Sequence, residues 1–269
     1  MSKQRLDVLL VDRNLIETRE KAKRVIMAGL VFSEQVRLDK PGMKVALDIP
    51  LHVKGKEIPY VGRGGLKLEK ALKEFSISVT DKIMVDVGSS TGGFTDCALQ
   101  NGLALCYAID VGYNQLDWKL RSDERVVVME RTNFRYVLAT DFTKGIPNFA
   151  SVDVSFISLR LILPVLKKIV EPNSDIVVLI KPQFEAGRDI VGKKGVIRDP
   201  IVHQDVIQEM SAFAKQEGYQ LLALTHSPIT GGKGNIEFLA HLGWEKEVPE
   251  PDFTNEQFKE VVQQAHATL

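Results

Sequence analysis

The segment that best predicts the architecture of this chain is IMVDVGSSTGGF, residues 83–94. An apolar run carries Asp86 near its end, small residues follow, and a helix is expected from about Gly92 to Asn101. This order predicts a strand, a tight turn and a helix N-terminus, whose free backbone N–H groups face whatever lies above the end of the strand. Glycine in the turn lets the backbone approach a ligand closely. The segment therefore predicts a ligand-binding turn.

The turn differs from two common phosphate-binding loops. Gly88, Ser90 and Gly93 do not supply the three glycines of the dinucleotide motif G-x-G-x-x-G, and no Lys-Ser or Lys-Thr pair ends the loop. The pattern Asp-x-Gly-x-x-x-Gly-Gly is instead similar to the cofactor loop of S-adenosylmethionine-dependent methyltransferases. Taken by itself, it fits an ordinary strand–helix turn equally well.

Charge is unevenly distributed along the 269 residues, a length that suits one or two domains. The net charge is zero, but residues 1–60 carry twelve Lys and Arg against eight Asp and Glu, a charge of +4, which leaves −4 for the remainder. A basic N-terminal segment predicts contact with a polyanion. A solvated surface without a partner is the alternative.

Cysteine usage and hydropathy favour a cytoplasmic protein. Cys97 and Cys106 are the only cysteines and belong to no Cys/His cluster, so neither a zinc site nor a disulfide framework is expected. The N-terminus lacks the apolar segment of a signal peptide. The longest apolar run, residues 103–109, is far shorter than the roughly 18–20 residues that span a bilayer. No membrane contact is expected.

The first sixty residues favour a small α+β module. A helix is expected over residues 5–16, and Thr18 can cap a second helix that ends near Gly29. A polar, Gly-rich hinge follows at residues 54–64, and we expect domains over 1–60 and 61–269. The order Arg-Leu-Asp (5–7), Thr-Arg (18–19), IMAGLV (26–31) and Lys-Pro-Gly (40–42) resembles the S4 RNA-binding module.

That resemblance implies recognition of RNA shape and phosphates by basic side chains. Each of these side chains, taken singly, also fits a solvated helix charge. The residues expected to contact RNA are Arg5, Arg19, Lys23, Arg24 and Arg63.

Beyond the hinge, strands and helices alternate, which predicts an α/β, Rossmann-like domain with a seven-stranded, mostly parallel sheet. Such sheets bind ligands at the carboxyl ends of their strands. The expected strands are residues 83–87, 104–110, 125–129, 151–155, 175–181, 219–226 and 235–242. The expected helices are residues 92–101, 114–121, 133–140, 158–170, 200–217 and 253–268.

Polar side chains stand at the predicted strand ends. Asp110 closes the second strand, where it can accept hydrogen bonds from a ribose, and Glu130 follows the third, beside an expected adenine pocket. Lys181 ends a buried apolar strand, which is costly unless the side chain is partnered or faces a cleft. Asp153 ends the fourth strand and Glu237 begins the last. At each of these positions the alternative to a site residue is an ordinary residue of a strand edge or a turn.

Six segments together resemble the TlyA family, FtsJ-like rRNA 2′-O-methyltransferases with an S4-like domain that are often named hemolysins. The segments are residues 60–72, 86–96, 130–133, 153–159, 181–185 and 234–239. The resemblance implies a catalytic tetrad of Lys67, Asp153, Lys181 and Glu237. Without the resemblance, Lys67 would be interpreted as a surface residue. It also implies S-adenosylmethionine as cofactor and rRNA in ribosomal subunits as partner. The cofactor contacts expected from the loop, the strand ends and the family are Asp86, Gly88, Ser90, Thr91, Gly92, Gly93, Phe94, Asp110, Glu130 and Phe156.

A ribose 2′-hydroxyl must lose its proton as it attacks, and a lysine has an ordinary pKa of about 10.4, so its environment must adapt it to act as a base. We hypothesise that Lys181 activates the hydroxyl and Asp153 orients it, while Lys67 and Glu237 position the ribose and balance charge. No metal is required because the methyl donor is already cationic. By analogy with the family, a cytidine of large-subunit rRNA is favoured; the small subunit and the oligomeric state are left open.

Two other functions are compatible with parts of the sequence. A membrane-active hemolysin would suit the family label, but no spanning segment is present and the closing helix is acidic. A ribosome-assembly factor without turnover would bind RNA and transfer no methyl group.

Overall fold

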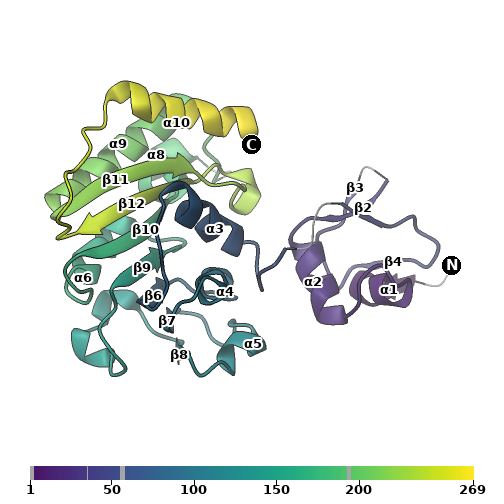
Figure 1. Cartoon of the computed structure of the whole chain (residues 1–269). Coiled ribbons are helices and arrows are strands. Elements are labelled where there is room, and N and C mark those ends of the chain that lie inside the picture. The colour runs from purple at the N-terminus through teal and green to yellow at the C-terminus, as the bar shows by residue number, and fades with distance from the viewer. Residues whose placement is uncertain (1–2, 35, 55–57, 193–194) are drawn as a thin grey trace. The chain divides into compact units, whose positions relative to one another are not determined.

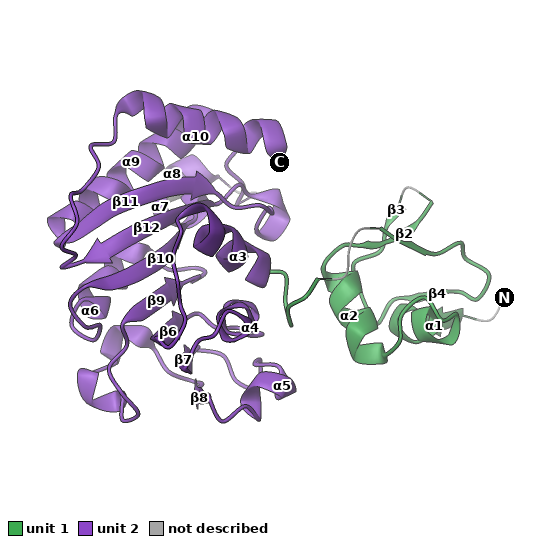
Figure 2. Cartoon of the chain, in the orientation of Figure 1, with its two compact units in different colours: residues 1–63 green, residues 64–269 purple. Residues whose placement is uncertain are grey.

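The chain folds into two compact units, residues 1–63 (unit 1) and 64–269 (unit 2) (Figure 2). The computed structural model describes residues 3–34, 36–54, 58–192 and 195–269. Part of the expected hinge, residues 55–57, therefore lies outside the described residues. Each unit buries a hydrophobic core of its own.

Unit 1 combines two helices with two small sheets. Its elements are α1 (Leu6–Asp12), α2 (Arg19–Met27), the antiparallel pair β1 (Lys3–Arg5) and β4 (Lys44–Ala46), and a second sheet in the order β3 (Val36–Arg37), β2 (Val31–Ser33), β5 (His52–Val53).

The ends of α2 confirm the sequence prediction. The Thr18 hydroxyl accepts a hydrogen bond from the Lys21 N–H at 3.2 Å, and Gly29 follows the helix with φ +74°. The first helix is shorter than predicted because Asn14 adopts φ +55°, which a right-handed helix cannot continue.

The seven-stranded sheet of unit 2 has the order β11-β12-β10-β9-β6-β7-β8 (Figure 1). β12 runs antiparallel to β10 and β11, and the remaining pairs are parallel. The predicted Rossmann-like α/β architecture is thereby confirmed. The strands are β6 (Ile83–Val87), β7 (Leu105–Ile109), β8 (Val126–Met129), β9 (Phe149–Val152), β10 (Ser174–Ile180), β11 (Tyr219–His226) and β12 (Phe238–Trp244).

Helices cover both faces of this sheet (Figure 1). Val85 and Val87 of β6 belong to the core cluster that contains α9 and α10, whereas Asp86 points the other way and meets Thr95 of α4. Among the described residues, the α-helices of unit 2 are α3 (Gly65–Glu74), α4 (Gly93–Gln100), α5 (Trp118–Arg121), α6 (Leu163–Leu166), α7 (Pro182–Glu185), α8 (Arg188–Val191), α9 (Pro200–Gln216) and α10 (Asn255–Thr268).

Three predicted helices are much shorter than expected. Pro164 cannot donate a backbone hydrogen bond, so residues 158–170 form a 3₁₀ turn followed by the short α6. Residues 133–140 form 3₁₀ turns instead, the first of them capped by the Asn133 side chain. In residues 114–121 the helix begins only at Trp118, because Asp117 has a non-helical backbone and caps the helix by accepting a hydrogen bond from the Lys119 N–H.

Two strands are displaced from their predicted positions. β9 ends at Val152, so Asp153 is the first residue after it, and β12 begins at Phe238, so Glu237 precedes it. Both acids thereby leave the sheet and stand in loops at its edge.

Candidate active site

The turn after β6 requires glycine at two positions. Gly88 adopts φ +86°, and a Cβ atom there would lie 2.6 Å from the Asp153 carbonyl oxygen. Gly92 adopts φ +93°, and a Cβ atom there would overlap the Leu120 side chain. L-residues with side chains rarely take these conformations, so the glycines of the sequence pattern have a steric reason. Gly88 lets the turn lie directly against the segment that follows β9, and Gly92 lets it lie against Leu120 of α5.

A pocket of about 450 Å³ opens at the carboxyl ends of β6, β7 and β9. Four of the residues predicted to bind cofactor line it: Gly88, Ser90, Asp110 and Phe156. The Asp110 carboxylate accepts hydrogen bonds from the backbone N–H groups of Ser90, at 2.8 Å, and Gly112, at 2.7 Å. Asp110 therefore shapes the turn as well as facing the pocket.

Seven of the thirteen remaining lining residues lie in segments that carry the family resemblance, residues 86–96, 130–133 and 153–159. The other six come from strand ends and loops that no motif of the sequence marks as ligand contacts. The additional lining residues are Val87, Ile109, Val111, Gln115, Thr132, Asn133, Phe134, Arg135, Asp153, Val154, Ser155, Ile157 and Ile162.

Asp86, expected to contact cofactor, is fully buried beneath the turn. Its carboxylate accepts hydrogen bonds from the hydroxyls of Thr95 and Ser151, each at 2.7 Å. Burial raises the pKa of Asp86 to about 6, and the two hydroxyls offset only part of that effect. Asp86 supports the turn from below and does not line the pocket.

Glu130 and four residues of the loop also lie outside the pocket lining. The Glu130 carboxylate accepts a hydrogen bond from the Gln115 N–H at 3.1 Å and pairs with Arg121. These bonds tie the segment after β8 to α5. The loop residues are Thr91, Gly92, Gly93 and Phe94.

The four residues of the predicted tetrad meet at one point. Lys67 Nζ, from α3, donates to Glu237 Oε2 at 2.8 Å and to Asp153 Oδ2 at 3.1 Å. Lys181 Nζ, directly after β10, lies 2.5 Å from Asp153 Oδ1 and 3.2 Å from the Ser155 hydroxyl. Two lysine and two acidic side chains thus form one compact cluster beside the pocket that Asp153 and Ser155 line.

Charge balance within this cluster fixes two of its protonation states. Burial alone would lower the pKa of Lys67, but the Asp153 and Glu237 carboxylates outweigh it and hold that pKa above its ordinary value. Burial alone would raise the pKa of Asp153, but Lys67 and Lys181 outweigh it and hold that pKa below its ordinary value. Lys67 is therefore an ammonium and Asp153 a carboxylate at neutral pH.

Phe156 stands at the pocket mouth with 91% of its surface exposed. Its backbone adopts φ +64°, and its ring lies 5.1 Å from that of Phe184. Glu185 accepts hydrogen bonds from the Ser158 hydroxyl at 2.5 Å and the Leu159 N–H at 2.9 Å. These contacts hold the loop after β9 against α7.

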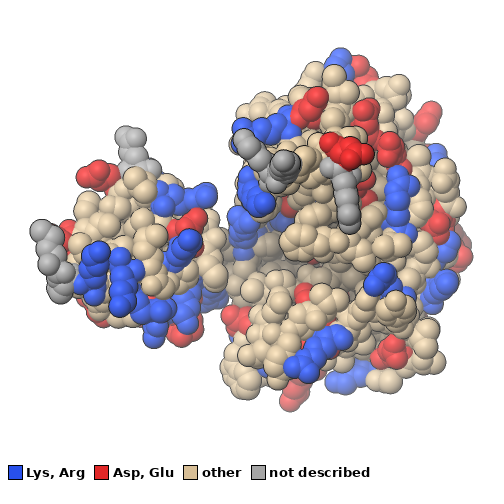
Figure 3. All heavy atoms as spheres, turned by 180° about the vertical axis from the view of Figure 1, so that it is seen from behind, with Lys and Arg blue, Asp and Glu red and all other residues tan. Residues whose placement is uncertain are grey.

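Lys and Arg side chains gather on unit 1 (Figure 3). Arg5 and Arg19 both pair with the buried Asp7, at 2.9 and 3.1 Å, yet each keeps nearly half of its side chain exposed. Their hydrogen bonds, with Arg5 the stronger influence, lower the pKa of Asp7 to about 2. Lys23 of α2 is half-buried, and Arg63 is exposed at the end of the unit.

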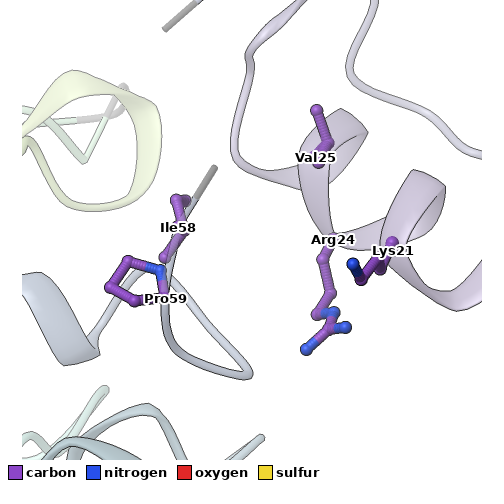
Figure 4. A pocket seen from close by; sticks show the side chains of 5 residues that line it. All are labelled: Lys21, Arg24, Val25, Ile58 and Pro59. Carbon is purple, nitrogen blue, oxygen red and sulfur yellow. The ribbon is translucent and has the colours of Figure 1, made fainter. Parts of the chain in front are cut away.

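A small pocket of about 200 Å³ lies beside α2 (Figure 4). Lys21, Arg24 and Val25 line it from the helix, and Ile58 and Pro59 line it from the segment opposite. Arg24, one of the predicted RNA contacts, thus stands in a cationic recess.

The described residues contain neither a metal-binding group nor a membrane-spanning helix. No cluster of three or more His, Cys, Asp or Glu could hold a metal ion within those residues. Over the same residues, every helix is too short or too polar to cross a membrane.

Comparisons with known proteins agree with this architecture. The family model for FtsJ-like methyltransferases matches residues 60–244, and that for the S4 domain matches residues 4–48. YqxC of Bacillus subtilis is 66% identical over 99% of this chain and 95% of its own length. The Mycobacterium tuberculosis enzyme named 16S/23S rRNA (cytidine-2′-O)-methyltransferase TlyA is 40% identical over 88% of this chain and 89% of its own. A solved structure from Streptococcus thermophilus, 54% identical, superposes with a TM-score of 0.79 and covers 100% of this chain and 97% of that one.

Proposed function

Because the chain belongs to the TlyA branch of the FtsJ-like methyltransferase family, whose cofactor is S-adenosylmethionine, we propose that it methylates the ribose 2′-hydroxyl of a cytidine in large-subunit rRNA. The observation that carries this proposal is the cluster of Lys67, Asp153, Lys181 and Glu237 beside a pocket at the strand ends. Relatives named for the same reaction on 16S/23S or 23S rRNA support the substrate.

The pocket suits a nucleoside cofactor on its own features. Apolar walls such as Ile109 and Phe134 fit a flat base, and Asp110 offers carboxylate oxygens at the end of β7. The absence of a Cβ atom at Gly88 keeps backbone close to the pocket. The bound cofactor supplies an electrophilic methyl group on a sulfonium, and the remaining chemistry falls to the side chains of the chain itself.

Lys181 is better placed than Lys67 to accept the proton of the 2′-hydroxyl. Lys67 is held by two carboxylates, so its proton is fixed. Lys181 contacts one carboxylate and the neutral Ser155 hydroxyl, and both of these partners line the pocket. In this proposal Asp153 orients Lys181, and the Lys67–Glu237 pair holds Asp153 in place.

Unit 1 supplies the RNA affinity in this proposal. Its S4 match and the basic side chains of α2, among which Arg19 is exposed, suit phosphate contacts, which attract RNA without reading its sequence. Methylation then depends on unit 2, so we assign recognition to residues 1–60 and chemistry to residues 61–269. An rRNA substrate supports a cytoplasmic location as part of this proposal.

Mapping of ribose methylation tests the proposal directly. Ribosomal RNA from cells with and without this protein is compared by mass spectrometry, and one cytidine 2′-O-methyl group of the large subunit should be missing without it. A missing small-subunit methyl group would add a second substrate. Unchanged methylation in both subunits would refute the proposal.

The two other functions give different results with purified protein. An assembly factor would bind rRNA and transfer no labelled methyl group from S-adenosylmethionine. A hemolysin, the name given to a Brachyspira hyodysenteriae relative 44% identical to this chain, would release dye from lipid vesicles.

A further inference from the structure

The three-stranded sheet of unit 1 carries an aromatic side chain, Phe32, on the face that points away from the hydrophobic core of the unit. Val31 of β2 pairs with Val53 of β5, and both turn inward to the hydrophobic core. The next residue, Phe32, must point outward because side chains alternate along a strand. Its direct cross-strand neighbours are Arg37 on one side and His52 on the other. A phenyl ring therefore stands at the centre of an outer face, between two nitrogen-bearing side chains.

The side chains around Phe32 form a flat, cationic surface. The rings of Phe32 and His52 are nearly parallel, with 19° between their planes and 6.0 Å between their centroids. Lys54 Nζ lies 4.8 Å from the centre of the Phe32 ring. Lys54 and Arg37 are exposed, and Glu34 is the single acidic residue in residues 30–38 and 51–54. The surface thus combines an aromatic platform with excess positive charge.

We propose that this face, made of Phe32, Arg37, His52 and Lys54, binds an unpaired nucleotide of the RNA by stacking its base on Phe32. Unpaired bases stack on aromatic rings, while neighbouring cations attract the phosphates on either side. A stacked base takes the place of the Lys54 ammonium over the ring and leaves it to pair with a phosphate. The face is separate from the basic residues of α2, so unit 1 contacts RNA through two elements.

This inference rests on the proposed function, because it needs RNA as the substrate. It adds to that function a contact with an unpaired nucleotide of the RNA. A purely structural role for Phe32 would be a surface cation–π pair, which stabilises a fold weakly. Such a pair predicts no effect of the ring on RNA affinity. Binding therefore separates the two roles.

The test uses the full chain and a fluorescein-labelled single-stranded RNA octamer of mixed sequence. Phe32→Leu keeps an apolar side chain and removes the ring, and it should weaken binding about 5- to 100-fold, the range of one base–aromatic stack. Phe32→Tyr keeps the ring and should bind within about twofold of the unchanged protein. Lys54→Met should reduce the dependence of log affinity on log salt concentration by about 0.7.

Val36→Ala is the matched control, because Val36 lies in the same sheet with 65% of its surface exposed and has no ring. It should bind within about twofold of the unchanged protein. Circular dichroism and cofactor affinity show that each variant is folded.

Equal octamer affinity of Phe32→Leu and the unchanged protein would overturn the inference. A loss confined to intact ribosomal subunits would also overturn it, since it would identify a protein contact. Failure of the proposed function looks different: the unchanged protein would transfer no methyl group to rRNA, whatever its affinity for the octamer.

Discussion

Lys67 Nζ and Glu237 Oε2 lie 2.8 Å apart although 170 residues separate them in the chain. Lys67 belongs to α3, which precedes the first strand of the sheet, and Glu237 precedes β12, the last. The ion pair is buried at both ends. It can form only when the first helix and the last strand of unit 2 are both in place. The site is therefore assembled by the whole unit and not by one segment.

Replacing Lys181 should separate catalysis from cofactor binding. Lys181→Met removes the amine beside Asp153 and keeps an unbranched side chain, so the rate of methyl transfer should fall by about 10²- to 10⁴-fold, the usual contribution of a general base. Single-turnover transfer of a labelled methyl group measures this rate. Cofactor affinity should change by less than about threefold, because the lost group serves the acceptor.

Lys168→Met is the control for that experiment. Lys168 is an exposed lysine of the same unit, so its loss should leave the transfer rate unchanged. A normal rate in folded Lys181→Met would remove Lys181 from the mechanism.

Breaking the Lys67–Glu237 pair should destabilise unit 2. Among the described residues, Lys67 contacts two carboxylates, and Glu237→Gln removes one of them and leaves Asp153. Leaving a buried charge without a partner costs about 3–5 kcal/mol of unfolding free energy, so this change should cost up to about that amount. Urea denaturation measures the change. The double variant with Lys67→Met should lose less than the sum of the single variants, because the second change removes the ammonium that Glu237→Gln leaves with one carboxylate partner in place of two.

Glu74→Gln provides the comparison on the same helix. Glu74 is 45% exposed and lies 3.7 Å from Lys70, so removing its charge should cost less than about 1 kcal/mol. Equal losses for Glu74→Gln and Glu237→Gln would contradict the special role of the buried pair.

The turn at Gly88 was predictable from the sequence because its requirements are local. A strand, small residues and a helix start follow one another, and the structure adds only which atoms crowd Gly88. The clustering of Lys67 with Glu237 could be anticipated only through the family resemblance. No local pattern states that the antiparallel β12 lies beside β10, and that order brings Glu237 to the site.

Side-chain partners were the least predictable feature. Glu130 stands at a strand end, as expected, but Arg121 and the Gln115 N–H bind its carboxylate. The position of Arg121 depends on where α5 begins, and the sequence prediction started this helix four residues before the position that the Asp117 cap sets. Asp86 likewise faces Thr95 and Ser151, because neighbouring strands and helices set what surrounds a buried acid.

A methyl group at Gly88 should damage the pocket. Gly88→Ala meets two obstacles, a φ of +86° and the Asp153 carbonyl oxygen 2.6 Å from the new Cβ. The expected result is a stability loss of about 1–3 kcal/mol and weaker cofactor binding, because the turn must shift. Calorimetric titration with S-adenosylmethionine measures the binding.

Gly187→Ala is the matched control, since φ there is −53° and nothing lies within 4 Å of the added methyl group. Its cofactor affinity should equal that of the unchanged protein. If both alanine variants bind cofactor normally, the turn at Gly88 does not form the cofactor site.

Asp86 should make unfolding depend on pH in a direction opposite to most acids. Burial raises its pKa from 3.8 in the unfolded chain to about 6, so the folded state holds this proton more tightly. The stabilisation from that proton is complete below pH 3.8 and is lost as the pH rises through 6. The loss amounts to about 3 kcal/mol between acidic and neutral pH, at 1.36 kcal/mol per pH unit.

Asp86→Asn isolates this contribution because asparagine stays neutral throughout, and the adjacent hydroxyls of Thr95 and Ser151 can donate or accept hydrogen bonds. The unfolding free energy of the variant minus that of the unchanged protein should rise by about 2.4 kcal/mol from pH 4 to pH 7.5, because part of the effect lies below pH 4. Urea denaturation at several pH values measures both proteins under identical conditions, so other titrating groups cancel. A difference that stays constant over this range would show that Asp86 is ionised throughout, and the hydroxyls would then fully compensate its burial.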